Sequence, residues 1–213
     1  MPTIGFLHTA EVHVATFRGL VREAALDARD VHVVDPGLLA EARELGIGDG
    51  LRERIAEHLR VLAREADAIV CTCSTIGGHA EALADGLPVP VMRVDRPMAE
   101  QAVSAGGRVT VVAAVESTLE PTRVLLEECA NGPGTNILVS PCVEAWPLFE
   151  AGDLEGYGEV LAEHVRQIAG QTDVIVLAQA SMALVEPLVA DLDVPVLCSP
   201  RLGVQAAARL AGA

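Results

Sequence analysis

The stretch from Asp67 to Gly78 contains a nucleophilic side chain, Cys73, at a position where it could take part in catalysis. Its apolar residues predict a short buried strand, and its small residues predict a turn followed by a helix over 79–84. This order places Cys73 at the carboxyl end of a strand with a helix N-terminus behind it, where backbone N–H groups favour negative charge. A thiol in that position has a lowered pKa and can act as a nucleophile or transfer a proton. The alternative is that Cys73 is a small apolar residue buried at a strand end.

A second stretch repeats this pattern 106 residues later. Asp173 corresponds to Asp67, and Gln179 falls at the position of Cys73. A matching Val-Pro-Val run follows each copy, 22 residues after the first Asp and 21 residues after the second. This spacing predicts a duplicated α/β unit. Two copies that face each other would bring Cys73 and Gln179 to the two sides of one cleft.

Composition narrows the classes of function. The chain has 213 residues, of which 51% are hydrophobic, and this is ample for one domain or for two small ones. The formal net charge of −15 argues against nucleic acid and against an anionic membrane surface as partners. The sequence shows neither a signal peptide nor a run of membrane-spanning length, so we expect a cytoplasmic protein.

The reactive side chains that the sequence contains also exclude several kinds of chemistry. All fifteen basic residues are arginines, so no lysine can form a Schiff base or complete a Walker-type phosphate loop. The five cysteines and six histidines lack the paired spacing that is typical of metal ligands. We therefore expect neither a metal nor a cofactor, and acid–base chemistry must come from Cys, His, Asp, Glu or Tyr.

Strands and helices alternate along the chain, and the strands are continuous Val/Ile runs, which predicts an α/β fold with parallel sheets covered on both faces. In such sheets ligands bind outside the carboxyl ends of the strands. The residues at these ends form the candidate site, and they are His8, Thr9, Cys73, Ser74, Thr75, Ser117, Thr118, Gln179, Ala180 and Ser181.

Four segments resemble the aspartate/glutamate racemase superfamily, which includes hydantoin racemases, maleate isomerases and arylmalonate decarboxylases; they are residues 68–77, 90–100, 118–122 and 176–183. The resemblance covers nearly the whole length. It implies two similar flavodoxin-like lobes with parallel sheets, related by a pseudo-twofold axis, with the active site between them. The final segment returns to the first lobe, so the expected lobes are 1–96 plus 198–213 and 97–197. The resemblance also implies a homodimer and cofactor-independent catalysis on small carboxylates.

The resemblance assigns roles to individual residues. Family racemases use two cysteines, one in each lobe, which add or remove the proton α to a carboxylate on opposite faces. Cys73 corresponds to the first cysteine, and Ser74 and Thr75 correspond to residues that hold a substrate carboxylate. Gln179 stands in the place of the second cysteine, and its amide cannot exchange a proton near neutral pH. Ser181 stands where the family commonly has a histidine.

The first of three hypotheses is an enzyme with one thiol, a decarboxylase or isomerase that forms an enediolate-like intermediate. Cys73 would act as the acid, base or nucleophile, and His8 would orient or deprotonate it. Hydroxyl groups of the candidate site and backbone N–H groups would stabilise the developing charge. Gln179 would hold a carboxylate or carbonyl of the substrate, or it would be bonded within its own lobe.

The second hypothesis is an amino-acid or hydantoin racemase or epimerase that draws its second acid from Cys142, Glu116 or Glu144. The third is a ligand-binding relative that has lost turnover. A small carboxylate or a hydantoin-like compound is the expected ligand in each case, and the residues do not identify it further.

Overall fold

The computed structural model describes residues 1–24, 27–130 and 134–212. Its internal contacts divide the chain into two compact units. The first lobe comprises Met1–Arg96 with Pro200–Ala213, and the second lobe comprises Pro97–Ser199.

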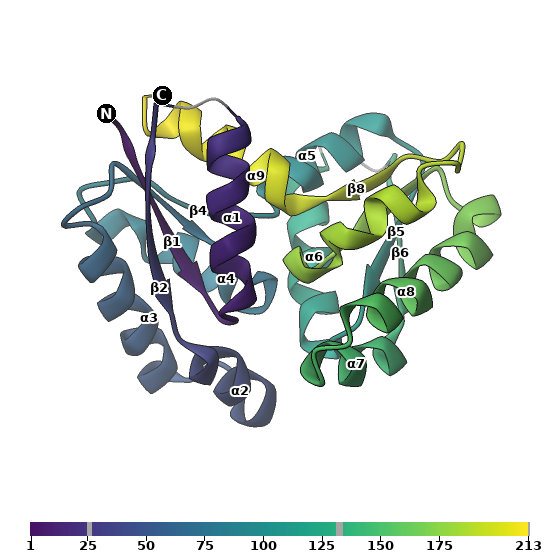
Figure 1. Cartoon of the computed structure of the whole chain (residues 1–213), viewed down its shortest axis with the longest axis horizontal. Coiled ribbons are helices and arrows are strands. Elements are labelled where there is room, and N and C mark those ends of the chain that lie inside the picture. Colours follow the sequence, from purple (N-terminus) through teal and green to yellow (C-terminus); the bar gives the residue numbers. More distant parts are fainter. Residues whose placement is uncertain (25–26, 131–133, 213) are drawn as a thin grey trace. The chain divides into compact units, whose positions relative to one another are not determined.

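The first lobe is built on a four-stranded parallel sheet of order β2-β1-β3-β4. Its strands are β1 (Thr3–His8), β2 (Arg29–Val34), β3 (Ala68–Cys71) and β4 (Val91–Arg93). The helices are α1 (Val12–Glu23), α2 (Pro36–Leu45), α3 (Asp49–Leu62), α4 (Ser74–Ala82), the short η1 (Ala84–Gly86) and the closing α9 (Ser199–Leu210). Helices lie on both faces of the sheet (Figure 1).

The second lobe has a parallel sheet of order β6-β5-β7-β8. Its strands are β5 (Arg108–Ala113), β6 (Asn136–Pro141), β7 (Val174–Leu177) and β8 (Val196–Cys198). The helices are α5 (Arg96–Ala105), α6 (Glu116–Cys129), α7 (Trp146–Glu150) and α8 (Leu154–Ile168), and the 3₁₀ segments are η2 (Val143–Ala145), η3 (Ala169–Gln171) and η4 (Ala180–Val189).

The two sheets repeat one design down to individual hydrogen bonds. Corresponding strands occupy the same places in both orders. The carboxylate of Asp67 accepts a hydrogen bond from the backbone N–H of Thr3 at 2.8 Å, and that of Asp173 accepts one from Arg108 at 2.7 Å. Each aspartate therefore ties the start of its own strand to the start of the neighbouring strand. These features confirm the predicted α/β class with two flavodoxin-like parallel sheets.

The helix after β3 begins earlier than the sequence predicts. We expected a turn over the small residues and a helix at 79–84, but α4 begins at Ser74, directly after Cys73. The glycines inside this helix have a packing reason. A Cβ built on Gly77 would lie 2.9 Å from Cβ of Arg93 on β4. Gly77 therefore permits the close approach of α4 to β4, and it does not mark a turn.

The first sheet has an apolar face and a face of rings. Leu7, Ile69 and Cys71 point to one face, where they meet buried residues of α2, α3 and α4. Because successive strand residues point to opposite faces, Phe6 and His8 lie on the other. There they join a set of stacked and tilted rings, which we call the ring cluster: Phe6, His8, His13, Phe17 and His32.

Hydrogen bonds run through the ring cluster. Nδ1 of His8 lies 2.8 Å from Oγ1 of Thr72, and its Nε2 lies 2.9 Å from Nδ1 of His32. Nε2 of His32 in turn lies 2.7 Å from a carboxylate oxygen of Asp30. Burial lowers the pKa of His8 to about 3, with smaller contributions from the charges of His13 and His32. Burial also lowers the pKa of His13 to about 4, so both rings are neutral at neutral pH.

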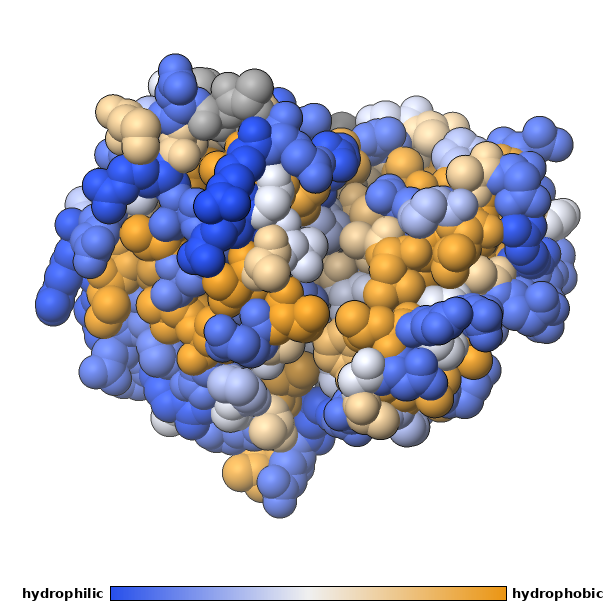
Figure 2. Space-filling view, viewed as in Figure 1, coloured by the Kyte–Doolittle hydropathy of each residue, from blue (hydrophilic) through white to orange (hydrophobic). Residues whose placement is uncertain are grey.

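The surface shown in Figure 2 mixes hydrophilic and apolar side chains. Exposed large apolar residues such as Leu45, Val61 and Leu210 belong to different helices. Scattered residues of this kind are normal on a protein surface. Within the described part of the chain, no helix has both the length and the apolar character that crossing a membrane requires.

Substitution of Gly77 in α4 should have an unusual effect on the stability of the protein. Replacing a helical glycine by alanine normally stabilises a helix by about 1 kcal/mol. Gly77→Ala should instead lower the free energy of unfolding by about 1–3 kcal/mol, because the new methyl group meets Arg93 Cβ. Urea unfolding measures the difference. The matched control is Gly50→Ala in α3, where no heavy atom lies within 4 Å of the added Cβ and we expect a small gain. A Gly77→Ala protein as stable as wild type would contradict the packing argument.

The two buried histidines of the ring cluster should make the folded protein less stable as the pH falls. Below pH 6.5 an unfolded chain protonates His8 and His13, whereas the folded chain keeps them neutral down to pH 3–4. The free energy of unfolding should therefore fall as pH falls, by roughly 1.4 kcal/mol per pH unit for each ring, or about 2 kcal/mol each at pH 5. Urea unfolding at pH 7.5 and pH 5 measures this loss.

The variant His8→Asn retains hydrogen-bonding capacity without a titrating ring and should show about half the acid-dependent loss. Phe17→Leu is the control from the same cluster. It should be less stable at both pH values while keeping the wild-type pH dependence. Equal pH dependence in wild type and His8→Asn would rule out His8 as a source.

Candidate active site

Cys73 lies between β3 and α4 in an extended conformation, with φ −107° and ψ 114°. Its sulfur is hydrogen-bonded to the hydroxyls of Thr9 and Thr75 and to the backbone of Thr75 and Ile76. The side chain is mostly buried, with 9% exposed. The structure thus brings Thr9, Cys73 and Thr75 together at the N-terminus of α4. Ser74 is the first residue of the same helix and is buried.

The structure corrects the expected pKa of the thiol. We expected the helix N-terminus to lower the pKa of Cys73. Burial raises it, because the charged form loses its hydration, and the hydrogen bonds from Thr9, Thr75 and Ile76 offset only part of that cost. Cys73 is therefore a protonated thiol at neutral pH, surrounded by donors that stabilise the anion once it forms.

The position of His8 also requires a correction. Both ring nitrogens are engaged, one with Thr72 and the other with His32. The ring belongs to the face of the sheet that carries the ring cluster, whereas Cys73 belongs to the apolar cluster on the opposite face. The hydrogen bonds of the Cys73 sulfur come from Thr9, Thr75 and Ile76. The structure therefore does not support the expectation that His8 orients or deprotonates Cys73.

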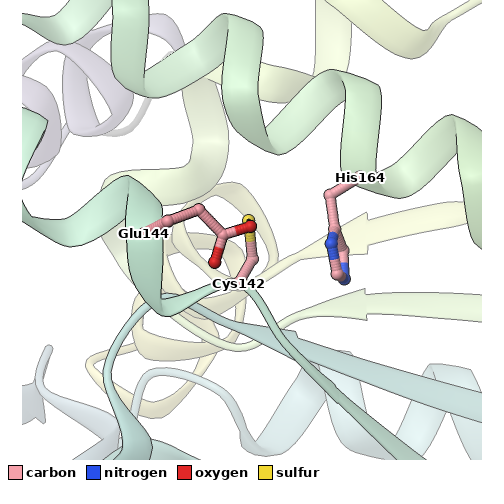
Figure 3. Close-up of side chains that lie close together, drawn as sticks. All are labelled: Cys142, Glu144 and His164. Carbon is pink, nitrogen blue, oxygen red and sulfur yellow. The ribbon is translucent and has the colours of Figure 1, made fainter.

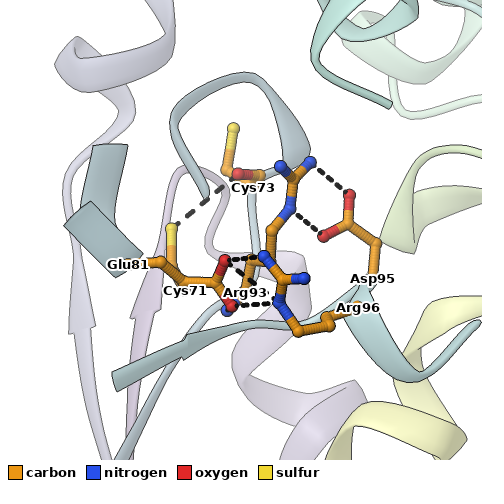
Figure 4. Close-up of polar contacts among 6 residues, drawn as sticks. All are labelled: Cys71, Cys73, Glu81, Arg93, Asp95 and Arg96. Carbon is orange, nitrogen blue, oxygen red and sulfur yellow. Dashed lines mark hydrogen bonds and ion pairs between the residues drawn. The ribbon is translucent and has the colours of Figure 1, made fainter. Parts of the chain in front are cut away.

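A buried ion pair near Cys73 was missed by sequence reasoning. Arg93 binds Asp95 through two hydrogen bonds, of 2.6 and 2.9 Å, and the two side chains are 4% and 0% exposed (Figure 4). The backbone N–H of Arg93 also donates to Glu81 of α4 at 3.0 Å. These contacts join the end of β4 to the helix that begins beside Cys73. The sequence offered two signals, namely the resemblance of residues 90–100 to the superfamily and the pair of glycines in α4, which make room for the Arg93 side chain.

In the second lobe, Gln179 occupies the position that corresponds to Cys73. Its carbonyl oxygen accepts hydrogen bonds from the backbone N–H groups of Ala114 at 2.6 Å and Val115 at 3.1 Å. These bonds fix the amide within its own lobe. They leave the NH₂ group of Gln179, which has no hydrogen-bond partner among the described residues, as a donor.

The lobes differ at a second corresponding position. The sheets pair Ile4 with Ala68 and Val109 with Val174, and this register equates Thr9 with Ala114. The first lobe therefore has a hydroxyl beside a thiol. The second has neither, and the Gln179 amide bonds the backbone there instead.

The remaining candidate residues of the second lobe lie at the starts of two helical segments. Ser117 and Thr118 belong to the first turn of α6, and Thr118 is buried. Ala180 is the first residue of η4. The hydroxyl of Ser181 lies 2.9 Å from that of Tyr157, whose pKa burial raises to about 12. Ser181 is thus bonded to a neutral phenol at neutral pH.

The residues proposed as an alternative second acid lie in different settings. Cys142 is fully buried, and its sulfur lies 3.5 Å from a carboxylate oxygen of Glu144. Burial and the negative charge of Glu144 raise the pKa of Cys142 to about 12. Glu116 is an exposed residue at the start of α6. The structure therefore pairs Cys142 with Glu144 and does not present it as an isolated acid.

Comparison with known proteins identifies the family. The sequence model of the Asp/Glu/Hydantoin racemase family matches residues 15–207. No protein of curated function matches the sequence at a significant level.

Several solved structures share the fold at low sequence identity. The aspartate racemase of Picrophilus torridus is 15% identical, with a TM-score of 0.76 over 100% of this chain and 95% of its own. A glutamate racemase from Thermus thermophilus, in complex with beta-chloro-D-alanine, is 19% identical, with a TM-score of 0.73 over 98% of this chain and 79% of its own. A mutant of arylmalonate decarboxylase is 20% identical, with a TM-score of 0.62 over 99% of this chain and 94% of its own. With the family match over most of its length, the chain belongs to the Asp/Glu/Hydantoin racemase family and is an enzyme of the racemase type.

Proposed function

We propose that this enzyme acts without a cofactor on a small carboxylate or a related carbonyl compound through an enediolate-like intermediate, with Cys73 as its single thiol acid/base. The reaction is of decarboxylase or isomerase type. One observation carries the proposal: the two lobes place different groups at the same position. Cys73 is surrounded by hydrogen-bond donors at a helix N-terminus, whereas Gln179 is an amide bonded to its own backbone.

The protonated state of Cys73 suits the role of an acid. In a decarboxylation, the bond between the α-carbon and one carboxylate breaks, carbon dioxide leaves, and the electron pair remains as an enediolate. The Cys73 thiol gives its proton to the α-carbon, and the resulting thiolate regains a proton from water. Because burial raises the pKa of Cys73, the proton is present at neutral pH when the intermediate forms.

The hydrogen bonds around the sulfur stabilise the Cys73 thiolate that remains after the proton has been transferred. When the thiolate forms, the hydroxyls of Thr9 and Thr75 and the start of α4 surround it. Fixed donors and a helix N-terminus favour an anion in a site of low dielectric constant. Thr9 and Thr75 therefore assist proton transfer, and Ser74 and Thr75 remain our proposed carboxylate-binding residues.

Gln179 is proposed to bind substrate and not to transfer a proton. An amide neither gains nor loses a proton near neutral pH. Because backbone N–H groups hold its oxygen, Gln179 presents its NH₂ group, which can donate to a carboxylate or carbonyl oxygen. Ser117, Thr118, Ala180 and Ser181 are proposed as further substrate-binding residues.

Turnover in deuterated water tests the proposal. Malonates, chiral amino acids, hydantoins and maleate are each incubated with the enzyme, and products are analysed for carbon dioxide, cis–trans conversion, deuterium and configuration. We expect either carbon dioxide release, with a new deuterium on one face of the α-carbon, or cis–trans conversion of maleate. Deuterium uptake with loss of chirality would show a racemase and overturn the one-thiol mechanism. Ligand binding without turnover would overturn the catalytic proposal.

Removal of the thiol should abolish this activity. Cys73→Ala is expected to lower kcat by about 10²–10⁴-fold, the usual contribution of a general acid or base. The far-ultraviolet circular dichroism spectrum should be unchanged. The matched control is Cys129→Ala, which removes a half-buried thiol of α6 and should retain wild-type kcat. The wild-type rate should also fall only above pH 9, because an acid with a raised pKa loses its proton there. An unchanged rate in Cys73→Ala would exclude the mechanism.

A second thiol should change the stereochemical outcome. Gln179→Cys places an exchangeable proton at the position that corresponds to Cys73. We expect α-deuterium exchange with loss of chirality, measured by chiral chromatography of the product in deuterated water. Gln179→Ala is the control, since it removes the amide without supplying a thiol, and it should leave the product with one configuration. Retention of a single configuration in Gln179→Cys would contradict the assignment of position 179.

A further inference from the structure

Three side chains of types that bind metals meet at one edge of the second lobe, and the proposed function uses none of them. Cys142 follows edge strand β6, Glu144 belongs to η2, and His164 projects from α8 (Figure 3). One ligand atom from each residue, namely the sulfur, a carboxylate oxygen and a ring nitrogen, lies within 4.8 Å of the other two. The sulfur and the nearest carboxylate oxygen are 3.5 Å apart.

These separations suit a tetrahedral ion. With a Zn–S bond of about 2.3 Å and Zn–N and Zn–O bonds of about 2.0–2.1 Å, neighbouring ligand atoms on tetrahedral zinc are about 3.4–3.6 Å apart. The pair formed by Cys142 and Glu144 already has that spacing. The other separations are at most 4.8 Å, and Glu144 is an exposed residue whose side chain can adjust when an ion binds.

The backbone and the imidazole are held in place around the cluster. The N–H of Cys142 donates to the carbonyl of Ala113 at 2.8 Å, and the N–H of Ala145 donates to the carbonyl of Cys142 at 3.2 Å. Nε2 of His164 lies 2.8 Å from the hydroxyl of Ser140 on β6. Hydrogen bonds that orient ligands in this way are a regular feature of metal sites.

A hollow beside the cluster supplies charge and access. It measures about 350 Å³ and is lined by Glu144, Glu159, Val160, Glu163, His164 and Gln167. Three of these residues are glutamates and none is an arginine, so the lining attracts cations. Glu163 accepts a hydrogen bond from Gln167 at 3.1 Å. The hollow therefore gives an ion a route to Glu144 and His164 and gives water the space to occupy a fourth ligand position.

We propose that Cys142, Glu144 and His164 form a binding site for one zinc ion in the second lobe. A thiolate and an imidazole favour zinc over magnesium and calcium, which prefer oxygen ligands alone. On binding, the thiol of Cys142 releases its proton to solvent as the Zn–S bond forms. No sequence motif indicates this site, because Cys142 and His164 are 22 residues apart and neither belongs to a paired motif.

Titration of the metal-free full-length protein with zinc chloride tests the proposal. We expect one zinc ion per chain by calorimetry and by elemental analysis after desalting. Cobalt(II) in the same site should show a thiolate charge-transfer band and the intense visible bands of tetrahedral coordination. Cys142→Ser should remove the charge-transfer band. Glu144→Gln and His164→Gln should each weaken zinc binding at least about 100-fold, because loss of an orienting partner alone costs about 10–100-fold.

Two controls separate this site from the other thiols and from the proposed function. Cys129→Ser and Cys73→Ser should retain wild-type affinity and stoichiometry for zinc. Glu144 is exposed, so Glu144→Gln remains decisive even if a change at the buried Cys142 impairs folding. Absence of zinc binding at micromolar concentration would overturn the proposal. So would full affinity in Glu144→Gln and His164→Gln, or loss of binding in Cys73→Ser.

Discussion

The proposed chemistry of this protein depends on the cost of burying a sulfur anion at the end of a parallel strand. Burial raises the pKa of Cys73, and the hydroxyl and backbone groups around it return only part of the lost hydration. The surrounding structure keeps this balance in place. Arg93 and Glu81 join β4 to α4, and Gly77 lets the helix, which begins at Ser74, pack closely against β4.

The duplicated fold makes the difference between the lobes informative. Both lobes use the same strand order, the same parallel register and the same aspartate at the start of the third strand. Against this shared background, two linked positions differ. Thr9 and Cys73 form a hydroxyl–thiol pair, whereas Ala114 and Gln179 form a backbone–amide pair. The amide thus fills a backbone hydrogen-bonding position, which explains how the fold accommodates glutamine at the position that corresponds to Cys73.

The sequence predicted the repeating strands because continuous apolar runs and a repeat of 106 residues are local signals. It predicted the candidate residues at strand ends for the same reason. It could not predict which face of the sheet each side chain would occupy. Leu7 and His8 are neighbours in β1, yet one contacts the apolar cluster and the other joins the ring cluster. The ionisation of Cys73 was also out of reach, because the sign of its pKa shift depends on burial that only the folded chain defines. The sequence predicts a turn at Gly77 and Gly78 because the Arg93 side chain that packs against them lies 16 and 15 residues away in sequence.

Burial of a reactive thiol and provision of anion-binding donors have different consequences at different stages of the proposed reaction. In the resting enzyme, desolvation is the larger effect and keeps the proton on Cys73. Once the proton has moved to carbon, the same donors face a thiolate, and hydrogen bonds to an ionised group are about twice as strong as neutral ones. The site therefore opposes the anion at rest and supports it after transfer. A proton donor requires that order of events, whereas a thiolate base would require a lowered pKa before substrate arrives. The raised pKa of Cys73 is consequently consistent with the proposed protonation of an intermediate, and it argues against abstraction of an α-proton by this sulfur.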